Sequence, residues 1–279
     1  MLTSLQNPLV KQLRKLHQAK GRREQQQFLL EGTHLLQEAL AVGYPLGVVC
    51  CTENWRSRYP DLFAASHQQA ERLELASETV LGAIATTVNP DGVIATAPRG
   101  ALGLPDEPGQ LSLGLALETV QDPGNLGTMI RTAAAAGVEG LWLSADSVDL
   151  DHPKVLRATA GQWFRLPMGV TDDLAGVVQR FRAAGGQVVA TLPSATQTYW
   201  EIDFTRPTLI LLGNEGAGLS PGLAALADCA VSIPLAAGVE SLNVAIAAAL
   251  LVYEARRQRP PATAVAGSAP SHAMYRAPE

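Results

Sequence analysis

The chain has 279 residues, of which 47% are hydrophobic and 17% charged, and its formal net charge is −5. This composition is typical of a globular protein with one large or two ordinary domains, and it excludes an intrinsically disordered chain. The negative net charge argues against a uniformly basic nucleic-acid binder. No apolar run approaches the ~18 residues that a membrane span requires, so we expect no membrane association.

Positive charge is concentrated at the N-terminus. Residues 1–30 contain six basic side chains against Glu24 alone, namely Lys11, Arg14, Lys15, Lys20, Arg22 and Arg23. A basic arm on an acidic protein suits a phosphate-bearing partner, but a solvated helix face has the same pattern, and both interpretations stay open. The segment also has the basic, amphipathic character of a transit peptide. We favour a folded helix, because Asn7-Pro8 has the order of a cap and a first-turn proline.

The first 97 residues alternate between helical and strand-like patterns. Apolar spacing predicts helices over 8–20 and 33–41, and Ser77 is a good N-cap for a third helix ending at 84. Short runs predict strands over 47–52, 71–75 and 93–97. We therefore predict a small α/β domain over residues 1–97.

The three cysteines carry no metal or disulfide signature. Cys50 and Cys51 are adjacent in an apolar run, Cys229 stands alone, and there is no CxxC. This usage predicts reduced, buried thiols in a cytoplasmic protein and no metal site.

The pattern breaks at residues 98–109, where three prolines and three glycines predict an interdomain linker. Residues 110–258 then alternate again. Strands are expected over 111–117, 140–143, 188–191, 208–212 and 230–233, and helices over 126–136, 153–160, 174–184, 219–227 and 242–257. Such alternation predicts an α/β domain with a mainly parallel sheet and helices on both faces. Residues 259–279 are rich in Pro, Ala and Ser, and we expect a disordered tail.

Three loops after predicted strands carry polar residues of chemical interest. The first, residues 120–127, brings Asp122 and Asn125 to the start of a helix that also carries Arg131. Helix N-termini attract anions, so this loop suits a phosphate or carboxylate. Alternatively, Asn125 is an N-cap and Arg131 an ordinary surface residue.

The second loop, residues 212–219, has the order G-x-x-G-x-G, which fails both the dinucleotide fingerprint and the P-loop. Glu215 would repel a phosphate, so the loop fits a cationic or hydroxyl-bearing ligand, unless Glu215 binds Arg131 instead. The third stretch, residues 233–251, is an apolar run, a small-residue loop and an alanine-rich helix. Ser241 is the predicted N-cap of that helix.

Together and in this order, the three loops resemble the motifs of the SpoU, or TrmH-like, RNA ribose 2′-O-methyltransferases. They read D-P-G-N-L-G-T-M-I-R-T-A at 122–133, L-L-G-N-E-G-A-G-L-S at 211–220, and I-P-L…G-V-E-S-L-N-V-A at 233–245. The stretch F-L-L-E-G-T-H-L-L-Q-E-A-L at 28–40 is similar to the L30e-like substrate-binding domain that many members carry in front. The resemblance implies S-adenosylmethionine (SAM) as cofactor, RNA as substrate, a C-terminal trefoil knot (the SPOUT fold) and a homodimer formed through the knot.

The resemblance also implies roles for single residues. The motif polar residues, expected at the catalytic centre, are Arg131, Asn125, Glu215, Ser241 and Asn243. The expected SAM-binding residues are Thr191, Leu192, Leu212, Gly213, Asn214, Gly216, Ile233, Pro234 and Leu242. The expected RNA-binding residues of the front domain are Lys11, Arg14, Lys15, Arg22 and Arg23.

Arg131 is expected at the nucleophile, contributed by its own protomer or by the partner. A charged guanidinium has no acceptor, so the identity of the general base stays open, and stabilising the developing alkoxide suits Arg131 better. Gln162 departs from the family pattern, which usually has a small residue there, and it bears on substrate choice and packing. Trp142, Trp163 and Trp200 either stack on bases or, as we favour, pack in the core.

We expect ribosomal RNA of the large subunit as substrate, because the front domain is of the type seen in such members. The alternatives are a transfer-RNA methyltransferase and a non-catalytic RNA-binding protein with a degenerate SAM pocket. A nucleotide-dependent oxidoreductase is disfavoured, because no acidic residue follows a G-x-G-x-x-G.

Overall fold

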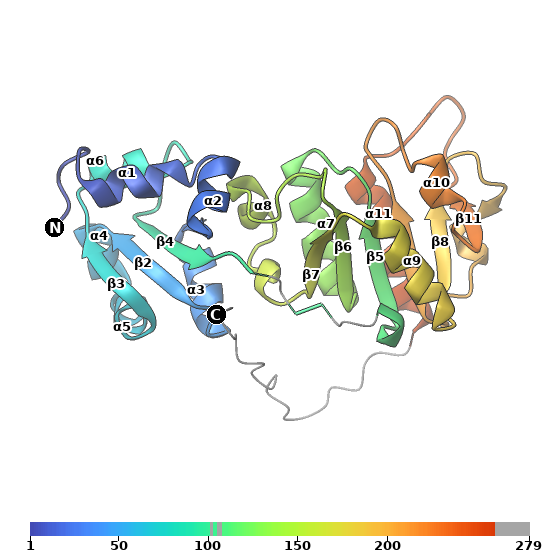
Figure 1. Ribbon diagram of the computed structural model, residues 1–279, viewed down its shortest axis with the longest axis horizontal. Coiled ribbons are helices and arrows are strands. Elements are labelled where there is room, and N and C mark those ends of the chain that lie inside the picture. Colours follow the sequence, from blue (N-terminus) through green and yellow to red (C-terminus); the bar gives the residue numbers. More distant parts are fainter. Residues whose placement is uncertain (101–102, 105–107, 260–279) are drawn as a thin grey trace.

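The computed structural model describes residues 1–100, 103–104 and 108–259. Its helices and strands are arranged around two separate sheets, one of four strands and one of seven (Figure 1). We call residues 1–100 the N-terminal unit and residues 108–259 the C-terminal unit. Part of the predicted linker and all but the first residue of the predicted disordered tail lie outside the described residues.

The N-terminal unit has a mixed sheet in the order β1-β4-β2-β3, in which only the β2–β3 pair is parallel. Its elements are α1 (Pro8–Lys15), α2 (Ala19–Gln25), β1 (Gln27–Glu31), α3 (Thr33–Ala41), β2 (Leu46–Cys51), α4 (Glu53–Arg58), α5 (Pro60–Gln69), β3 (Ala70–Leu75), α6 (Glu78–Ile84) and β4 (Val93–Pro98).

The single helix expected over residues 8–20 is wrong, because two helices stand there. Asn7 caps α1 as expected, its side-chain oxygen accepting from the Leu9 N–H. The chain then turns so that Gly21 of α2 lies against the last residue of α1. A Cβ on Gly21 would lie 2.0 Å from the Lys15 carbonyl oxygen, so only glycine permits this approach.

The C-terminal unit has a sheet in the order β7-β6-β5-β10-β8-β11-β9, and all of its strand pairs are parallel. Its elements are η1 (Pro108–Gln110), β5 (Leu113–Leu117), α7 (Pro123–Ala136), β6 (Gly140–Ser144), α8 (Pro153–Ala158), η2 (Gln162–Phe164), β7 (Met168–Thr171), α9 (Leu174–Ala183), β8 (Gln187–Thr191), β9 (Gln197–Thr198), η3 (Tyr199–Glu201), β10 (Thr208–Leu212), α10 (Pro221–Ala224), β11 (Cys229–Ser232) and α11 (Val244–Gln258).

Helices cover both faces of this sheet, which confirms the predicted architecture (Figure 1). In β10, Ile210 and Leu212 belong to one core cluster with residues of α7 and α11, whereas Leu209 and Leu211 belong to another with residues of α9. This alternation is what a strand buried on both faces produces. The helix expected over 219–227 is wrong in extent, because only the short α10 forms there.

The two units share a hydrophobic core. Phe28 of β1 packs on Trp163 of η2, with ring centroids 5.0 Å apart, and Tyr44 contacts both Trp163 and Phe164. Gln162 therefore lies in a turn that presents two aromatic rings to the N-terminal unit. Trp142 and Trp163 are buried as expected, while Trp200 is 60% exposed.

Within the part of the chain that the structure describes, no helix is long and apolar enough to cross a membrane. The same residues contain no cluster of three or more His, Cys, Asp or Glu side chains suited to a metal ion.

Candidate active site

The three polar loops leave neighbouring strands at one edge of the seven-stranded sheet. The strands β5, β10, β8 and β11 are adjacent and parallel, so their carboxyl ends lie side by side. The segment after β5 leads into α7, the glycine loop follows β10, and the third loop follows β11. Open parallel sheets bind ligands at this edge, and the fold thus brings together residues up to 118 positions apart in sequence.

One side-chain network joins the three loops. Asn125 donates from Nδ2 to Oε1 of Glu215 at 3.2 Å, and its Oδ1 accepts from Nδ2 of Asn243 at 2.9 Å. Asn125 is therefore the central link, with one hydrogen bond to the second loop and one to the third. Each donor in this network faces an acceptor, and the two hydrogen bonds therefore fix the positions of the three segments relative to one another.

Glu215 lies at the start of α7. Its carboxylate accepts from the backbone N–H groups of Gln121 at 3.2 Å and Asp122 at 3.1 Å, in addition to Asn125. Partial burial opposes ionisation of Glu215, but these hydrogen bonds prevail and hold its pKa below the usual value. The alternative in which Glu215 binds Arg131 is wrong: the acidic side chain instead occupies the positive end of the helix.

Asp122, not Asn125, is the N-cap of α7. Its Oδ1 accepts from the Asn125 N–H at 2.8 Å, and Lys154 approaches its other oxygen at 3.5 Å. The hydrogen bond from the Asn125 N–H is the main reason that the pKa of Asp122 is lowered. The side chain of Asn125 therefore does not cap α7, and it is available to bind Glu215 and Asn243.

Asn243, not Ser241, is the N-cap of α11, so the helix begins two residues later than expected. The Asn243 Oδ1 accepts from the Ala245 N–H at 2.9 Å and from the Ile246 N–H at 3.4 Å. Its Nδ2 is thereby left to donate to Asn125. Ser241 is exposed in the preceding loop.

The residues expected to bind SAM lie at the carboxyl ends of β8, β10 and β11 and in the loops that follow. Thr191 ends β8, Leu192 donates its N–H to the Val231 carbonyl, and Leu212 ends β10. Ile233 follows β11 and is half-buried, whereas Gly216, Pro234 and Leu242 are exposed.

The glycine loop is tightly built. Asn214 accepts at Oδ1 from the N–H groups of Gly216 and Ala217, both at 2.9 Å, and donates from Nδ2 to the Thr119 carbonyl at 2.8 Å. A Cβ on Gly213 would lie 2.1 Å from the carbonyl carbon of Gly218, so no larger residue fits there.

One polar atom of this edge lacks a partner. The hydroxyl oxygen of Thr191 is buried and has no hydrogen-bond partner among the described residues. Buried polar atoms are normally satisfied, so an unpaired hydroxyl among ligand-binding loops marks a place where a ligand atom fits.

Arg131 lies apart from the network. It is exposed on α7, six residues after Asn125, which places it about 9 Å further along the helix axis and on another face. Its side chain forms no ion pair or hydrogen bond with any residue that the structure describes. The guanidinium is therefore available to an outside anion or to a second protomer.

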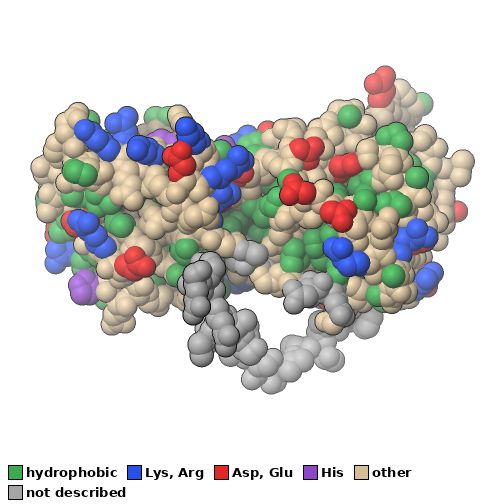
Figure 2. Space-filling view, in the orientation of Figure 1, with side chains coloured by type: hydrophobic (Ala, Val, Ile, Leu, Met, Phe, Trp, Pro, Cys, Tyr) green, Lys and Arg blue, Asp and Glu red, His purple; other side chains and the backbone are tan. Residues whose placement is uncertain are grey.

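The five predicted RNA-binding residues divide into three groups. Lys11, Arg14 and Lys15 are exposed and line, with His17 and Lys20, a groove of about 510 Å³ along α1 and α2. Basic side chains gather on this side of the N-terminal unit in Figure 2. Arg23 is 64% exposed and pairs with Asp149. Arg22 is only 1% exposed and paired with two aspartates, so its expected contact with RNA is wrong in this arrangement.

Comparison with known families agrees with this geometry. The model of the SpoU rRNA Methylase family matches residues 112–253, more than half of the chain. The chain belongs to this family. A second family, described as an MRM3-like substrate binding domain, matches residues 7–95.

Several relatives match this SpoU family member over nearly its full length. An uncharacterized tRNA/rRNA methyltransferase of Synechocystis sp. is 52% identical over 92% of this chain and 94% of its own. The 23S rRNA (guanosine(2553)-2′-O)-methyltransferase RlmP of Bacillus subtilis is 35% identical over 91% of this chain and 98% of its own. An AdoMet-bound rRNA methyltransferase from Sinorhizobium meliloti superposes with a TM-score of 0.79 at 36% identity, covering 92% of this chain and 97% of its own.

Two supporting residues of the SpoU site escaped the sequence reasoning. Glu118, at the end of β5, accepts from both the N–H and the hydroxyl of Ser220, each at 2.7 Å, and so holds the far end of the glycine loop. Thr119 supplies the carbonyl that Asn214 binds. The sequence pattern that could have predicted them is a pair of polar residues directly after an apolar strand. In a parallel sheet, this position lies at the edge where ligands bind.

Proposed function

We propose that this SpoU family member is a SAM-dependent RNA 2′-O-ribose methyltransferase that acts on 23S rRNA. The observation that carries the proposal is the Glu215–Asn125–Asn243 network, which links three segments at the ligand edge of a parallel sheet. Relatives named as 23S rRNA 2′-O-methyltransferases and an AdoMet-bound structural neighbour support it.

The residues at this edge fit a SAM molecule. Thr191 offers an unpaired buried hydroxyl, and the exposed Gly216 and Gly218 carry no side chain that would keep a ligand away from the loop. Leu192, Ile233 and Leu242 add apolar surface for the adenine and methionine portions. The proposed cofactor set is therefore the predicted one: Thr191, Leu192, Leu212, Gly213, Asn214, Gly216, Ile233, Pro234 and Leu242.

SAM, when bound, supplies an electrophilic methyl group on a sulfonium. The protein must then hold the ribose 2′-hydroxyl in line and favour loss of its proton. We assign Arg131 to the oxygen that receives the methyl group, where its fixed charge stabilises the developing alkoxide or holds the adjacent phosphate. The Glu215–Asn125–Asn243 network holds the three loops together, and Ser241 lies exposed in the loop before α11.

Replacement of Arg131 tests the assignment. Arg131→Ala should retain SAM affinity, measured by calorimetric titration, and lose turnover of tritiated SAM with rRNA from cells that lack this protein. Arg131→Lys should recover little, because an ammonium lacks the planar fork of the guanidinium. Turnover near that of the unmodified protein in Arg131→Ala would refute the assignment, and absence of SAM binding in the unmodified protein would favour a non-catalytic RNA-binding protein.

We further propose a homodimer, formed through the C-terminal knot, in which each protomer supplies Arg131 to its partner. An apolar stripe on α11 supports this: Ile246 is 50% and Tyr253 51% exposed, and they line a hollow with Tyr199 and Leu250. Ile246→Glu should shift the sedimentation coefficient to that of a monomer and abolish turnover. The matched control is Val88→Glu, an equally apolar and 95% exposed position of the N-terminal unit, which should do neither.

Mixing two variants that are impaired at different residues distinguishes the origin of Arg131. If Arg131 comes from the partner, protomers with Arg131→Ala and protomers with Asn125→Ala should form mixed dimers with one complete site, recovering about a quarter of full turnover. If each protomer uses its own Arg131, the mixture should have no more turnover than the average of the two variants measured separately.

The RNA partner and the domain organisation complete the proposal. We propose that residues 1–97 form an RNA-binding domain whose basic groove contacts phosphates through Lys11, Arg14, Lys15 and Lys20, followed by a linker over 98–109 and a catalytic domain over 110–258. Mapping of 2′-O-methylation in 23S rRNA and in tRNA, from cytoplasmic fractions of cells with and without the protein, tests the substrate. A site lost only in tRNA would favour the alternative.

A further inference from the structure

Arg22 is the largest charged side chain buried in the N-terminal unit, and its partners lie in the other unit. Its Nη2 donates to Oδ2 of Asp149 at 2.7 Å, and its Nε donates to Oδ1 of Asp151 at 3.0 Å. Its remaining nitrogen, Nη1, donates to the carbonyls of Leu16 and His17. The guanidinium thus closes the C-terminal end of α1 on one side and binds the other unit on the opposite side.

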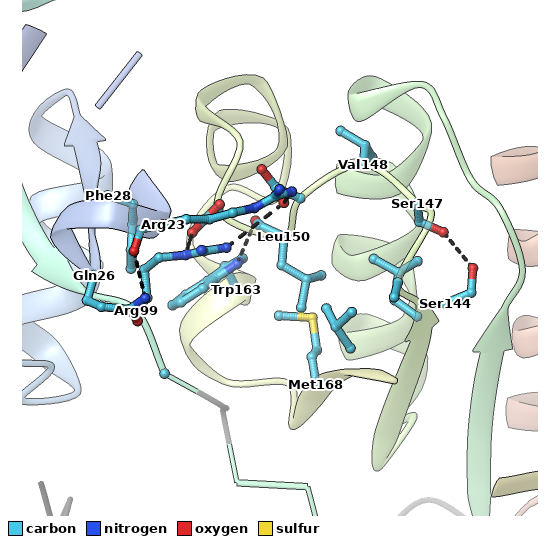
Figure 3. A pocket seen from close by; sticks show the side chains of 17 residues that line it. Arg23, Gln26, Phe28, Arg99, Ser144, Ser147, Val148, Leu150, Trp163 and Met168 are labelled. Atoms are coloured by element: carbon cyan, nitrogen blue, oxygen red, sulfur yellow. Dashed lines mark hydrogen bonds and ion pairs between the residues drawn. The ribbon is translucent and has the colours of Figure 1, made fainter. Parts of the chain in front are cut away.

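The two aspartates receive further cations from the same unit. Arg99 pairs with Asp151, and Arg23 donates to Asp149 at 3.2 Å. Figure 3 shows Arg23 and Arg99 extending from the N-terminal unit toward the loop that contains Leu150, with Trp163 beneath them. Three arginines therefore converge on one acidic loop, beside the shared aromatic core of Phe28 and Trp163.

That acidic loop, residues 145–152, is also bonded to the start of the candidate active site. The Val148 N–H donates to the Val120 carbonyl at 2.9 Å, and the Val120 N–H donates to the Ser147 hydroxyl at 3.0 Å. The Gln121 side chain donates to the Asp146 carbonyl at 2.8 Å. Gln121 in turn donates its backbone N–H to Glu215 of the central network.

We propose that Arg22 is a positioning residue that docks the N-terminal unit on the loop supporting the active site. It does not contact RNA itself; it fixes the basic groove of α1 and α2 relative to the segment over residues 119–125. A buried ion pair between units, next to a shared hydrophobic core, holds two units in one orientation, where a bare linker would leave them free to move. The expected effect on catalysis rests on the proposed function, whereas the contact between the two units does not.

The test uses the full-length chain with Arg22→Met, which keeps side-chain volume and removes the charge. Hydrogen exchange should increase in peptides covering residues 119–121 and 145–152. The specificity constant for RNA (kcat/KM) should fall about ten- to hundredfold, since small displacements of reacting groups have effects of that size. SAM affinity should change less than twofold, and the salt dependence of RNA binding should keep its slope, because no phosphate contact is removed.

Arg14→Met is the matched control, because Arg14 is an exposed arginine of the basic groove in the same unit. It should lower the salt slope by about one and leave hydrogen exchange at residues 119–121 unchanged. A fall in the salt slope for Arg22→Met, or unchanged exchange at residues 119–121, would overturn the proposal.

A double-mutant cycle covers the case in which Arg22→Met fails to fold. Asp151→Asn disrupts the same contact from the other unit, and Arg22→Lys keeps the charge without the two-pronged geometry. The losses of unfolding free energy caused by Arg22→Lys and by Asp151→Asn should be non-additive when the two substitutions are combined. Additive losses would contradict a direct docking contact. If the unmodified protein neither binds nor methylates rRNA, the proposed function fails, while hydrogen exchange and the cycle still decide the docking.

Discussion

Asn125→Asp is the sharpest perturbation of the central network, because it exchanges an amide nitrogen for an oxygen at nearly constant shape. The substitution removes the donor that binds Glu215 and places a second carboxylate where the amide nitrogen lies, 3.2 Å from Oε1 of Glu215. Two unit charges at that separation repel by about 1 kcal/mol in a water-like dielectric and about 5 kcal/mol at an effective dielectric constant of 20. Glu215 is exposed, so we expect about 1–2 kcal/mol.

This repulsion predicts a loss of turnover that depends on pH. A cost of about 1–2 kcal/mol corresponds to a roughly five- to thirtyfold fall in kcat/KM at pH 8. Two carboxylates sharing a site raise the pKa of one of them above the unperturbed value, which is about 3.9 for an aspartic acid. A protonated carboxyl group at position 125 would donate to Glu215 again, so the defect should shrink as the pH falls toward that raised pKa.

The assay is methyl transfer from tritiated SAM to rRNA between pH 5 and pH 8, with each rate divided by that of the unmodified protein at the same pH. Asn125→Ala is the control, because it loses the hydrogen bond to Glu215, together with the one from Asn243, and adds no titrating group. Its relative loss should be independent of pH. If the two variants have the same pH profile, the Asn125–Glu215 contact does not organise the site as described.

Two further predictions concern the glycine loop and the interface between units. Gly213→Ala should destabilise the chain by about 1–3 kcal/mol and weaken SAM binding, because its Cβ would meet the Gly218 backbone at 2.1 Å. Gly222→Ala, whose Cβ would meet nothing within 4 Å, should be neutral or stabilising in the same urea unfolding and calorimetric measurements. Glu31→Gln should destabilise by about 1–3 kcal/mol at pH 7, since the buried carboxylate accepts from Thr86, Thr87 and Arg157. These threonine hydrogen bonds outweigh the opposing effect of burial and hold the pKa of Glu31 below its unfolded value, so the stabilisation is present above about pH 4.3 and is lost as the pH falls through the folded pKa. A difference in unfolding free energy between the unmodified protein and the Glu31→Gln variant that stays constant down to pH 3 would contradict this account.

The parallel sheet was predictable because its signals are local. Strands β5, β6, β8 and β10 are largely apolar runs bounded by polar or glycine-rich turns, and the order of the three loops resembles one family. The short strands β7 and β9 lack such a run and were not predicted. Helix starts were less certain for a physical reason: Ser241 and Asn243 are both good caps. Asn243 serves because its amide can accept from α11 and donate to Asn125 at once, which a hydroxyl cannot do with the same reach.

The role of Arg22 was not predictable from its neighbours in sequence. Six cations in one segment predict a single basic surface, and five of them conform, with side chains that reach solvent. Arg22 differs because its partners Asp149 and Asp151 are 127 and 129 residues away. Only the folded arrangement of the two units shows that one of the six charges is already neutralised inside the protein.

The position of Glu215 changes how anion recognition at this site must be understood. The sequence favours a phosphate at the N-terminus of α7, but Glu215 already accepts from the backbone N–H groups of Gln121 and Asp122. A second anion at that helix end would meet a carboxylate, so the RNA backbone cannot be held there. The positive charge that the reaction needs must then come from a side chain outside the network. Arg131 is such a cation on the same helix, yet it lies about 9 Å away along the axis and on another face. Within one protomer, the loops that suit the cofactor therefore lie apart from the cation that suits the nucleophile. A site shared between two protomers is for this reason the arrangement to test.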